Sequence, residues 1–155
     1  MQTQGMDALQ NPHYIIEEEY RDGEELSLVK HEWLDGKVYA MAYGTFNHAT
    51  ICTNIAAIGK NALKGMPCKA RSSELRVKIQ SNGQEVYPDA VIFCPPARFV
   101  CKGDSTLLTP KVVFEVLSET TEKYDRTGKF NLYKTIEAFE EYILIEQDRI
   151  YIDHF

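Results

Sequence analysis

The chain has 155 residues, which suits one domain of typical size and is short for two. Its 44% hydrophobic and 26% charged residues exclude a disordered chain, and no apolar run reaches the ~20 residues of a membrane span. The N-terminus also lacks the pattern of a signal peptide. We therefore expect one cytoplasmic domain over residues 1–155, with residues 1–11 as a flexible N-terminal tail and no membrane partner.

The net charge of −6 is concentrated at the N-terminal end. Residues 1–45 hold three basic and nine acidic residues, whereas residues 46–155 hold fourteen of each. A solvated acidic helix face explains such an excess without any function. Because no part of the chain has a basic surplus, its charge does not predict strong sequence-independent binding to DNA.

The first half of the chain alternates between helical and strand-like patterns. Asp35-Gly36 is a strong two-residue turn signal and predicts a β-hairpin. Isoleucines at helical spacing predict a helix that begins at Thr45. The expected elements are a short acidic helix or turn at 14–25, hairpin strands at 28–33 and 37–41, a helix at 45–64, and strands at 68–71 and 74–79.

The second half predicts two strands that are apolar on both faces, at residues 86–94 and 111–118. Such strands lie at the centre of a sheet that helices cover. The remaining expected elements are a loop at 102–110, a helix at 122–138, and a closing hairpin of strands 141–146 and 149–154. The order of elements predicts an α/β (α+β) protein with a mixed β-sheet and helices on both faces.

Four cysteines are spread along the chain without a Cys-x-x-Cys pair or a histidine at zinc-finger spacing. We expect Cys52, Cys68, Cys94 and Cys101 to be reduced, small hydrophobic side chains, since structural zinc or disulfides are not indicated.

Glu115 is a carboxylate in an otherwise apolar strand. Val113 and Leu117 share its face, and the other face is apolar as well. An unpaired buried carboxylate costs several kcal/mol, so Glu115 must be paired, protonated or metal-bound. A salt bridge to a lysine or arginine and a role as metal ligand or catalytic group both remain open.

Asp89 repeats this anomaly on the other central strand, because aspartate is depleted in strands. It follows Pro88, so a simple turn at the strand entry is one interpretation. If the two central strands are neighbours, Asp89 and Glu115 together form a site for a hard divalent cation, Mg²⁺ or Mn²⁺. We then expect their carboxylates to lie roughly 3–6 Å apart.

The chain from residue 14 to 155 resembles the Uma-two family, which consists of restriction-endonuclease-like proteins within the PD-(D/E)XK nuclease superfamily. No single motif carries this resemblance, but the combination does. The motifs are Tyr87-Pro88-Asp89, Phe114-Glu115-Val116-Leu117-Ser118, Asp125-Arg126, Lys129-Phe130, Tyr133, the hairpin at 31–36, Asn47-His48, the strand at 73–77 and Glu140-Glu141-Tyr142.

The resemblance implies a restriction-endonuclease-like fold and metal-dependent endonuclease activity on DNA or another nucleic acid. Asp89 and Glu115 would bind the metal. Leu117 stands where the superfamily pattern has lysine, so the resemblance points to Lys129 as the catalytic cation, with Arg76 and Lys78 as alternatives. Homodimers are common among such nucleases, so a homodimer is a further expectation.

Glu32 matches the N-terminal acidic residue of the superfamily, which implies a third metal ligand and a catalytic role. Its other interpretation is a cross-strand partner of Lys37. His48 is a candidate neighbour of the site, although a packed or capping histidine is the simpler account, and Trp33 and Tyr133 are expected in the core. Two alternatives to a nuclease remain: a catalytically inactive interaction protein of the same fold, and a metal-dependent hydrolase of small phosphoesters.

Overall fold

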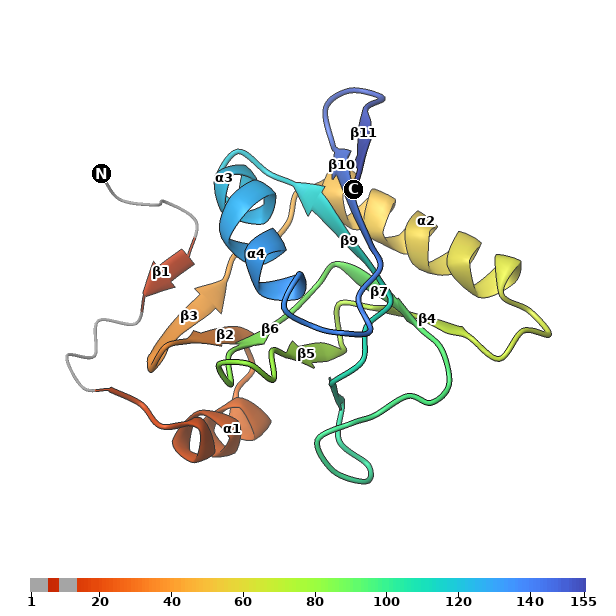
Figure 1. Ribbon diagram of the computed structural model, residues 1–155. Coiled ribbons are helices and arrows are strands. Elements are labelled where there is room, and N and C mark those ends of the chain that lie inside the picture. The colour runs from red at the N-terminus through yellow and green to blue at the C-terminus, as the bar shows by residue number, and fades with distance from the viewer. Residues whose placement is uncertain (1–5, 9–13) are drawn as a thin grey trace.

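The computed structural model describes residues 6–8 and 14–155, and it divides their strands between two sheets (Figure 1). The six-stranded sheet has the order β1 (Met6–Ala8), β3 (Lys37–Met41), β2 (His31–Leu34), β6 (Glu85–Val86), β5 (Arg76–Lys78) and β8 (Thr106–Leu107). The five-stranded sheet has the order β11 (Ile152–His154), β10 (Glu141–Glu146), β9 (Val112–Leu117), β7 (Ala90–Phe93) and β4 (Lys69–Ser72).

The predicted hairpin forms strands β2 and β3. Asp35 and Gly36 take φ values of 50° and 76°, the left-handed conformation that a two-residue hairpin turn requires. In the register of this hairpin Glu32 lies opposite Tyr39, while Lys37 lies opposite Leu34. The expectation that Glu32 is the cross-strand partner of Lys37 is therefore wrong.

Helices cover both faces of the five-stranded sheet, as the sequence predicts. The helix α2 (Phe46–Ala62) packs on one face, where Ile55 and Gly59 lie beside Phe114 of β9. The opposite face of β9 meets the segment that follows it, because the Tyr133 hydroxyl donates a hydrogen bond to Glu115. β9 lies centrally, parallel to β10 and antiparallel to β7.

The predicted strand at residues 86–94 is two strands, β6 and β7, which belong to different sheets. Pro88 has no N–H to donate to a sheet, so pairing stops there. The backbone of Tyr87 bonds to side chains instead: its N–H donates to Glu32 at 2.9 Å, and its carbonyl accepts from Lys129 at 2.9 Å. The predicted loop at 102–110 likewise contains a short strand, β8, which pairs parallel to β5.

The predicted helix at 122–138 is shorter and irregular. It consists of α3 (Glu122–Tyr124), a π-helical turn η1 (Asp125–Lys129) and α4 (Phe130–Tyr133). The regular helix ends because the Thr135 hydroxyl and the Ile136 N–H bond to carbonyls of the last helical turn. The acidic helix α1 (Glu17–Leu26) and α2 match the predicted elements to within a few residues.

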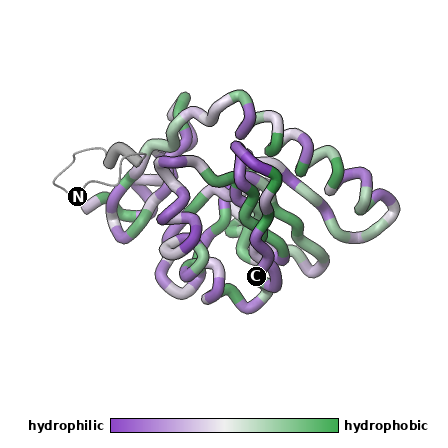
Figure 2. Tube along the Cα trace, turned by 90° about the horizontal axis from the view of Figure 1, so that it is seen from above, coloured by the Kyte–Doolittle hydropathy of each residue, from purple (hydrophilic) through white to green (hydrophobic). Residues whose placement is uncertain are grey.

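Apolar side chains from both sheets and from the α3–α4 segment form one core, in which Val77, Val113, Tyr133 and Tyr142 are fully buried. A smaller cluster around Trp33 lies under α1. Trp33 and Tyr133 are thus core residues, as expected. Figure 2 shows apolar strands gathered at the centre, while the helix α2 at one side contains both polar and apolar residues along its length.

Cys68 and Cys94 form a disulfide, which corrects the expectation that all four cysteines are reduced. The cause is the strand register. Lys69 of β4 lies opposite Phe93 of β7, so Cys68 just before Lys69 lies opposite Cys94 just after Phe93, with the Cα atoms 4.1 Å apart. Cys52 and Cys101 are free.

The expected N-terminal tail lies largely outside the described residues, and its described part, Met6–Ala8, pairs with β3 as β1. Within the described residues, none of the helices combines the length and the apolar character that a transmembrane segment needs.

Candidate active site

A cavity of about 490 Å³ lies where the central strand β9, the residues just before β7, the start of α2 and the π turn η1 come together. All four residues that the sequence nominates for chemistry line it, although three come from separate elements, β2, β9 and η1, and the fourth from the segment between β6 and β7. These residues are Glu32, Asp89, Glu115 and Lys129.

Glu115 lies on β9, and Asp89 directly precedes the neighbouring strand β7, so the expected position of Asp89 on the strand itself is off by one residue. Ala90 pairs with Phe114, so Asp89 faces Glu115 one position further along. The backbone of each strand bonds to the carboxylate of the other: Val116 N–H donates to Asp89 Oδ2 at 2.7 Å, and Asp89 N–H donates to Glu115 Oε2 at 3.4 Å. Both carboxylates are almost fully buried, at 8% and 2% exposure.

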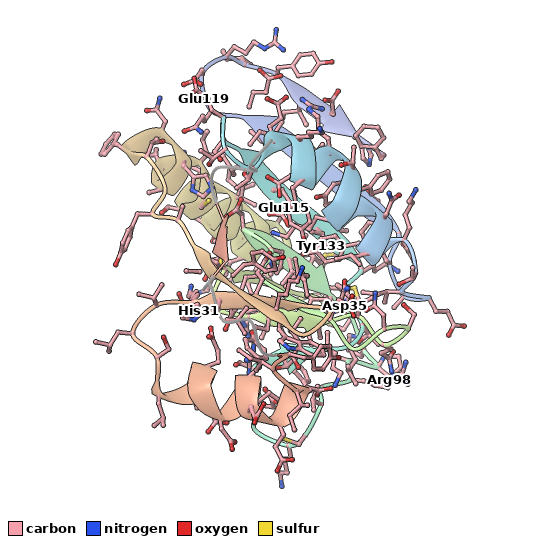
Figure 3. All side chains as sticks on the ribbon, turned by 90° about the vertical axis from the view of Figure 1, so that its left-hand side faces the viewer. His31, Asp35, Arg98, Glu115, Glu119 and Tyr133 are labelled. Carbon is pink, nitrogen blue, oxygen red and sulfur yellow. A yellow bond between two sulfur atoms is a disulfide. The ribbon has the colours of Figure 1, made fainter. Side chains whose placement is uncertain are left out.

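Lys129 is the cation that lies beside Glu115 and Glu32. Its ammonium lies 3.1 Å from Glu115 Oε1 and 3.2 Å from Glu32 Oε1, and it donates to the Tyr87 carbonyl. Figure 3 shows Glu115 beside the helical segment that carries Tyr133. The π turn brings Lys129 from that segment to Glu115.

The alternative cations lie elsewhere. Arg76 pairs with Glu85, and Lys78 pairs with Glu17, in a region under α1. Neither lines the cavity.

Three further polar residues of the site were not nominated as catalytic or metal-binding from the sequence. His48 Nε2 lies 3.3 Å from Asp89 Oδ2, and the Cys52 thiol lies 3.5 Å from His48 Nδ1. Asp125 is buried 3.9 Å from Lys129. His48 and Asp125 appear in the motifs of the family resemblance, but Cys52 carries no sequence signal beyond its position four residues after His48.

Burial and the density of carboxylates set the ionisation of the site. Burial raises the pKa of Glu115 well above its usual range; Lys129 opposes this effect, and the neighbouring carboxylates add to it. Burial likewise raises the pKa of Asp125 to about 6. Burial is the largest single influence on Asp89 and disfavours its ionised form, but the hydrogen bond and charge of His48, the charge of Lys129 and the Val116 N–H together lower the Asp89 pKa; Asp89 in turn raises the pKa of His48.

The arrangement fits a divalent cation in two respects. Among the described residues no hydrogen-bond donor contacts Asp89 Oδ1, so this oxygen is available as a ligand atom. The Tyr124 hydroxyl, which lines the same cavity, is buried and has no partner within the described part of the chain. A buried hydroxyl without a partner is unfavourable and is relieved by a bound water or ligand.

The mixed α/β architecture matches a solved structure of a nuclease-type protein. That structure is titled "a putative nuclease belonging to DUF820" from Anabaena variabilis ATCC 29413, and it superposes with a TM-score of 0.64 over 83% of this chain and 78% of that chain. The sequences are 16% identical, so the match establishes the fold alone. The expected fold class is confirmed.

The Uma2 family, described as "Putative restriction endonuclease", matches residues 17–155. Two relatives come from Synechocystis sp. (strain ATCC 27184 / PCC 6803 / Kazusa). "Uncharacterized protein slr1290" is 36% identical over 88% of this chain and 70% of its own length, and "Uncharacterized protein sll1609" is 26% identical over 88% and 77%. The chain belongs to the Uma2 family, which confirms the resemblance carried by its motifs.

Proposed function

We propose that this protein is a metal-dependent endonuclease that hydrolyses phosphodiester bonds of nucleic acids at the cavity between β7, β9, α2 and η1. One observation carries the proposal: Asp89, Glu115, Glu32 and Lys129 converge on this cavity from separate elements. Buried carboxylates gathered around one lysine beside an open space are unfavourable for stability alone, which favours a functional role.

Asp89 and Glu115 are the ligands that would hold Mg²⁺ or Mn²⁺, with Glu32 as a third candidate ligand. A cation held there lowers the pKa of a bound water and stabilises negative charge on a phosphate. Because its backbone N–H bonds to Glu115, Asp89 is fixed relative to the second carboxylate before any ligand enters.

Lys129 has two roles in this proposal. Its ammonium holds Glu115 and Glu32 in place, and it offers positive charge to the phosphate oxygens as charge develops on them. Since the Tyr87 carbonyl and the carboxylates surround the ammonium, its position is preorganised and does not depend on the substrate.

Cleavage of supercoiled plasmid and of single-stranded DNA tests the proposal. With Mg²⁺ or Mn²⁺, the unchanged protein should cleave at least one of these substrates, and Asp89→Asn or Glu115→Gln should slow cleavage at least about 100-fold. Glu137→Gln is the matched control, because Glu137 is exposed and lies outside the cavity. A folded protein that cleaves neither DNA in the presence of either cation would contradict the proposal.

A hydrolase of small phosphoesters is the second candidate, and the size of the cavity favours it. A volume of about 490 Å³ lies within the range of small-molecule sites, roughly 300–1,000 Å³. A small phosphodiester therefore belongs in the same assay: cleavage of this compound without cleavage of DNA would favour the second candidate.

The third candidate is a catalytically inactive interaction protein. The ion pairs of Lys129 with Glu115 and Glu32 favour this candidate, because they balance part of the charge without a metal. No hydrolysis of any of these substrates, together with intact folding, would favour it.

A further inference from the structure

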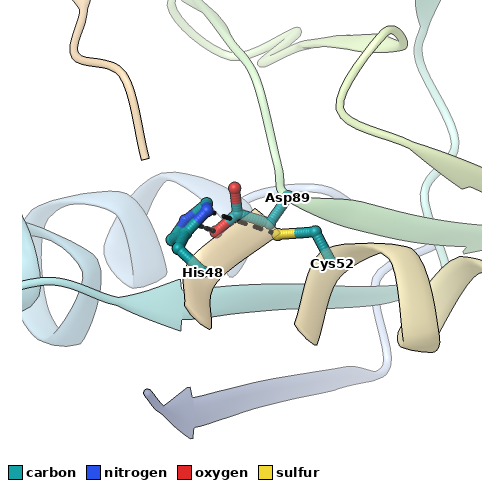
Figure 4. A group of neighbouring side chains, drawn as sticks. All are labelled: His48, Cys52 and Asp89. Carbon is teal, nitrogen blue, oxygen red and sulfur yellow. Dashed lines mark hydrogen bonds and ion pairs between the residues drawn. The ribbon is translucent and has the colours of Figure 1, made fainter. Parts of the chain in front are cut away.

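A second donor set lies next to the proposed magnesium ligands. His48, Cys52 and Asp89 each offer one ligand atom, and these atoms lie within 4.8 Å of one another. Figure 4 shows the three side chains converging, with His48 and Cys52 extending from the first turns of α2 toward Asp89. His48 and Cys52 are four residues apart, so they lie on the same face of the helix.

The local structure holds these side chains in place. The Thr45 hydroxyl caps α2 by accepting a hydrogen bond from the His48 N–H at 3.1 Å. The Val116 N–H donates to Asp89 Oδ2 at 2.7 Å and so holds the carboxylate from β9. The cluster thus joins the start of a helix to the junction of two central strands.

The chemistry of this set differs from that of the Asp89–Glu115 pair. Mg²⁺ prefers oxygen ligands, whereas an imidazole nitrogen, a thiolate and one carboxylate oxygen suit Zn²⁺ and cations that resemble it. Tetrahedral zinc has bonds of about 2.0–2.3 Å, which place neighbouring ligand atoms about 3.3–3.7 Å apart. One nitrogen of His48, the Cys52 sulfur and one Asp89 oxygen all lie within 4.8 Å of one another, so small movements of these side chains bring them to such separations.

We propose that His48, Cys52 and Asp89 form a binding site for Zn²⁺ or a similar transition-metal cation, and that its occupation withdraws Asp89 from the Mg²⁺ site and inhibits the protein. On binding, the Cys52 thiol releases its proton to solvent and coordinates as a thiolate. One imidazole nitrogen of His48 and one carboxylate oxygen of Asp89 complete three protein ligands, and water occupies the fourth position.

Glu115 is not part of this site, because the ligand atoms that lie within 4.8 Å of one another come from His48, Cys52 and Asp89. The two sites therefore share Asp89 alone. Inhibition through this shared ligand rests on the proposed function, whereas the bond between Cys52 and the cation does not.

Titration with Co²⁺, a coloured substitute for Zn²⁺, tests the bond. In the absence of thiol reductants, the unchanged protein should develop the near-ultraviolet absorption of a thiolate–cobalt bond at one equivalent. Cys52→Ser should abolish this band, and His48→Gln should weaken Co²⁺ binding at least about 10-fold. Cys101→Ser is the matched control, since Cys101 is the other free cysteine and is exposed. Absence of the band, or its persistence in Cys52→Ser, would overturn the proposal.

Competition with Mg²⁺ tests the shared ligand. Excess Mg²⁺ should weaken Co²⁺ binding by the unchanged protein, and it should have no such effect in Glu115→Gln, which keeps the cobalt band but lacks a Mg²⁺ ligand. A cobalt band that Mg²⁺ does not weaken would overturn the inhibitory role. Loss of DNA cleavage in Glu115→Gln together with an intact cobalt band would separate the two proposals, because cleavage tests the first and the band tests the second.

Discussion

Among the described residues, two clusters of buried and partly buried charged side chains differ in their balance of acidic and basic groups. The cavity cluster consists of Glu32, Asp89, Glu115, Asp125, His48 and Lys129. The α1 cluster consists of Glu17, Glu85, Asp104, Arg21, Arg76 and Lys78. Four carboxyl groups in the cavity cluster face one lysine and one histidine, whereas the α1 cluster has three acids and three bases.

The charge balance of each cluster corresponds to the surroundings of that cluster. Arg21 joins α1 to β6 and to the loop before β8, through contacts of 2.8 Å to Glu85 and 2.9 Å to Asp104. This network of ion pairs joins α1 to the strands β5 and β6 of the six-stranded sheet. The cavity cluster borders an open space and has a surplus of negative charge, which a cation from solvent would neutralise. Charge that is balanced within the protein indicates structure, and unbalanced charge beside a cavity indicates a ligand.

The largest expected effect on stability is in the α1 cluster. Glu85 is the carboxylate that Arg76 contacts within the described residues, so Glu85→Gln leaves a buried guanidinium without an anionic partner. We expect a loss of about 3–5 kcal/mol in the free energy of unfolding, measured in urea at neutral pH. Glu74→Gln, which breaks an exposed pair with Lys30, is the control and should change stability by about 1 kcal/mol or less.

Divalent cation should stabilise the protein through the cavity cluster. At about 100 times its dissociation constant, Mg²⁺ or Mn²⁺ that binds only the folded state adds about 2.7 kcal/mol. Thermal unfolding with and without cation measures this gain. We expect the gain in Glu85→Gln and not in Glu115→Gln; an equal gain in both variants would place the cation elsewhere.

The pH dependence of stability should also distinguish the clusters. The folded state holds the Asp125 proton up to about pH 6, whereas the unfolded chain releases it near its usual pKa of about 3.9. Folding therefore loses stability as pH rises through this interval, by at most about 3 kcal/mol. Asp125→Asn should gain stability relative to the unchanged protein between pH 4 and 7, as urea unfolding at both pH values would show.

Asp104, in the α1 cluster, should change the stability of the protein with pH in the direction opposite to that of Asp125. Burial disfavours its ionised form, but the hydrogen bonds from Arg21 and Thr106 and the charge of Arg21 together lower the pKa of Asp104. Its stabilisation is present above the unfolded pKa and is lost as pH falls through the folded pKa. Asp104→Asn should therefore remove a loss of stability that the unchanged protein shows as pH falls below about 4. If Asp125→Asn and Asp104→Asn altered the pH dependence of stability in the same direction, the contrast between the two clusters would be contradicted.

The smallest expected effect belongs to Glu115→Gln without cation. Lys129 keeps Glu32 and the Tyr87 carbonyl as partners, and repulsion among the carboxylates is reduced. We expect stability within about 1 kcal/mol of the unchanged protein, or slightly above it. A loss of 3–5 kcal/mol would show that Glu115 is half of a structural ion pair, as Glu85 is.

The sequence predicts the fold well where one periodic pattern dominates. The β2–β3 hairpin, α2 and β9 lie at or within a few residues of the predicted positions, because the Asp-Gly turn, the isoleucine spacing and the two-sided apolar strand are local signals. The break between β6 and β7 was missed although Pro88 marks it, since apolar residues continue on both sides. The Cys68–Cys94 bond depends on strand register, which cysteine spacing does not reveal.

The site follows the same division. Asp89 and Glu115 were identifiable because a carboxylate among apolar strand residues is anomalous on its own. Only the family resemblance predicts Lys129 and Glu32 as site residues. Neither the local sequence pattern nor the resemblance predicts Cys52. Its approach to Asp89 depends on how α2 packs against the sheet, which is a tertiary contact that no local pattern encodes.

The π turn η1 makes the spacing between Asp125 and Lys129 sensitive to chain length. A π-helical turn typically contains one residue more than the α-helical turn at the same place, so it can be regarded as an insertion that a deletion would reverse. Removal of Thr127, which is exposed, would let the segment run as a regular α-helix and would rotate Lys129 by about 100° relative to Tyr124. Lys129 would then turn away from the carboxylates while the helix itself gained regularity. In an alignment of this family, a single-residue gap at this segment should therefore mark chains that cannot place the lysine beside the carboxylates.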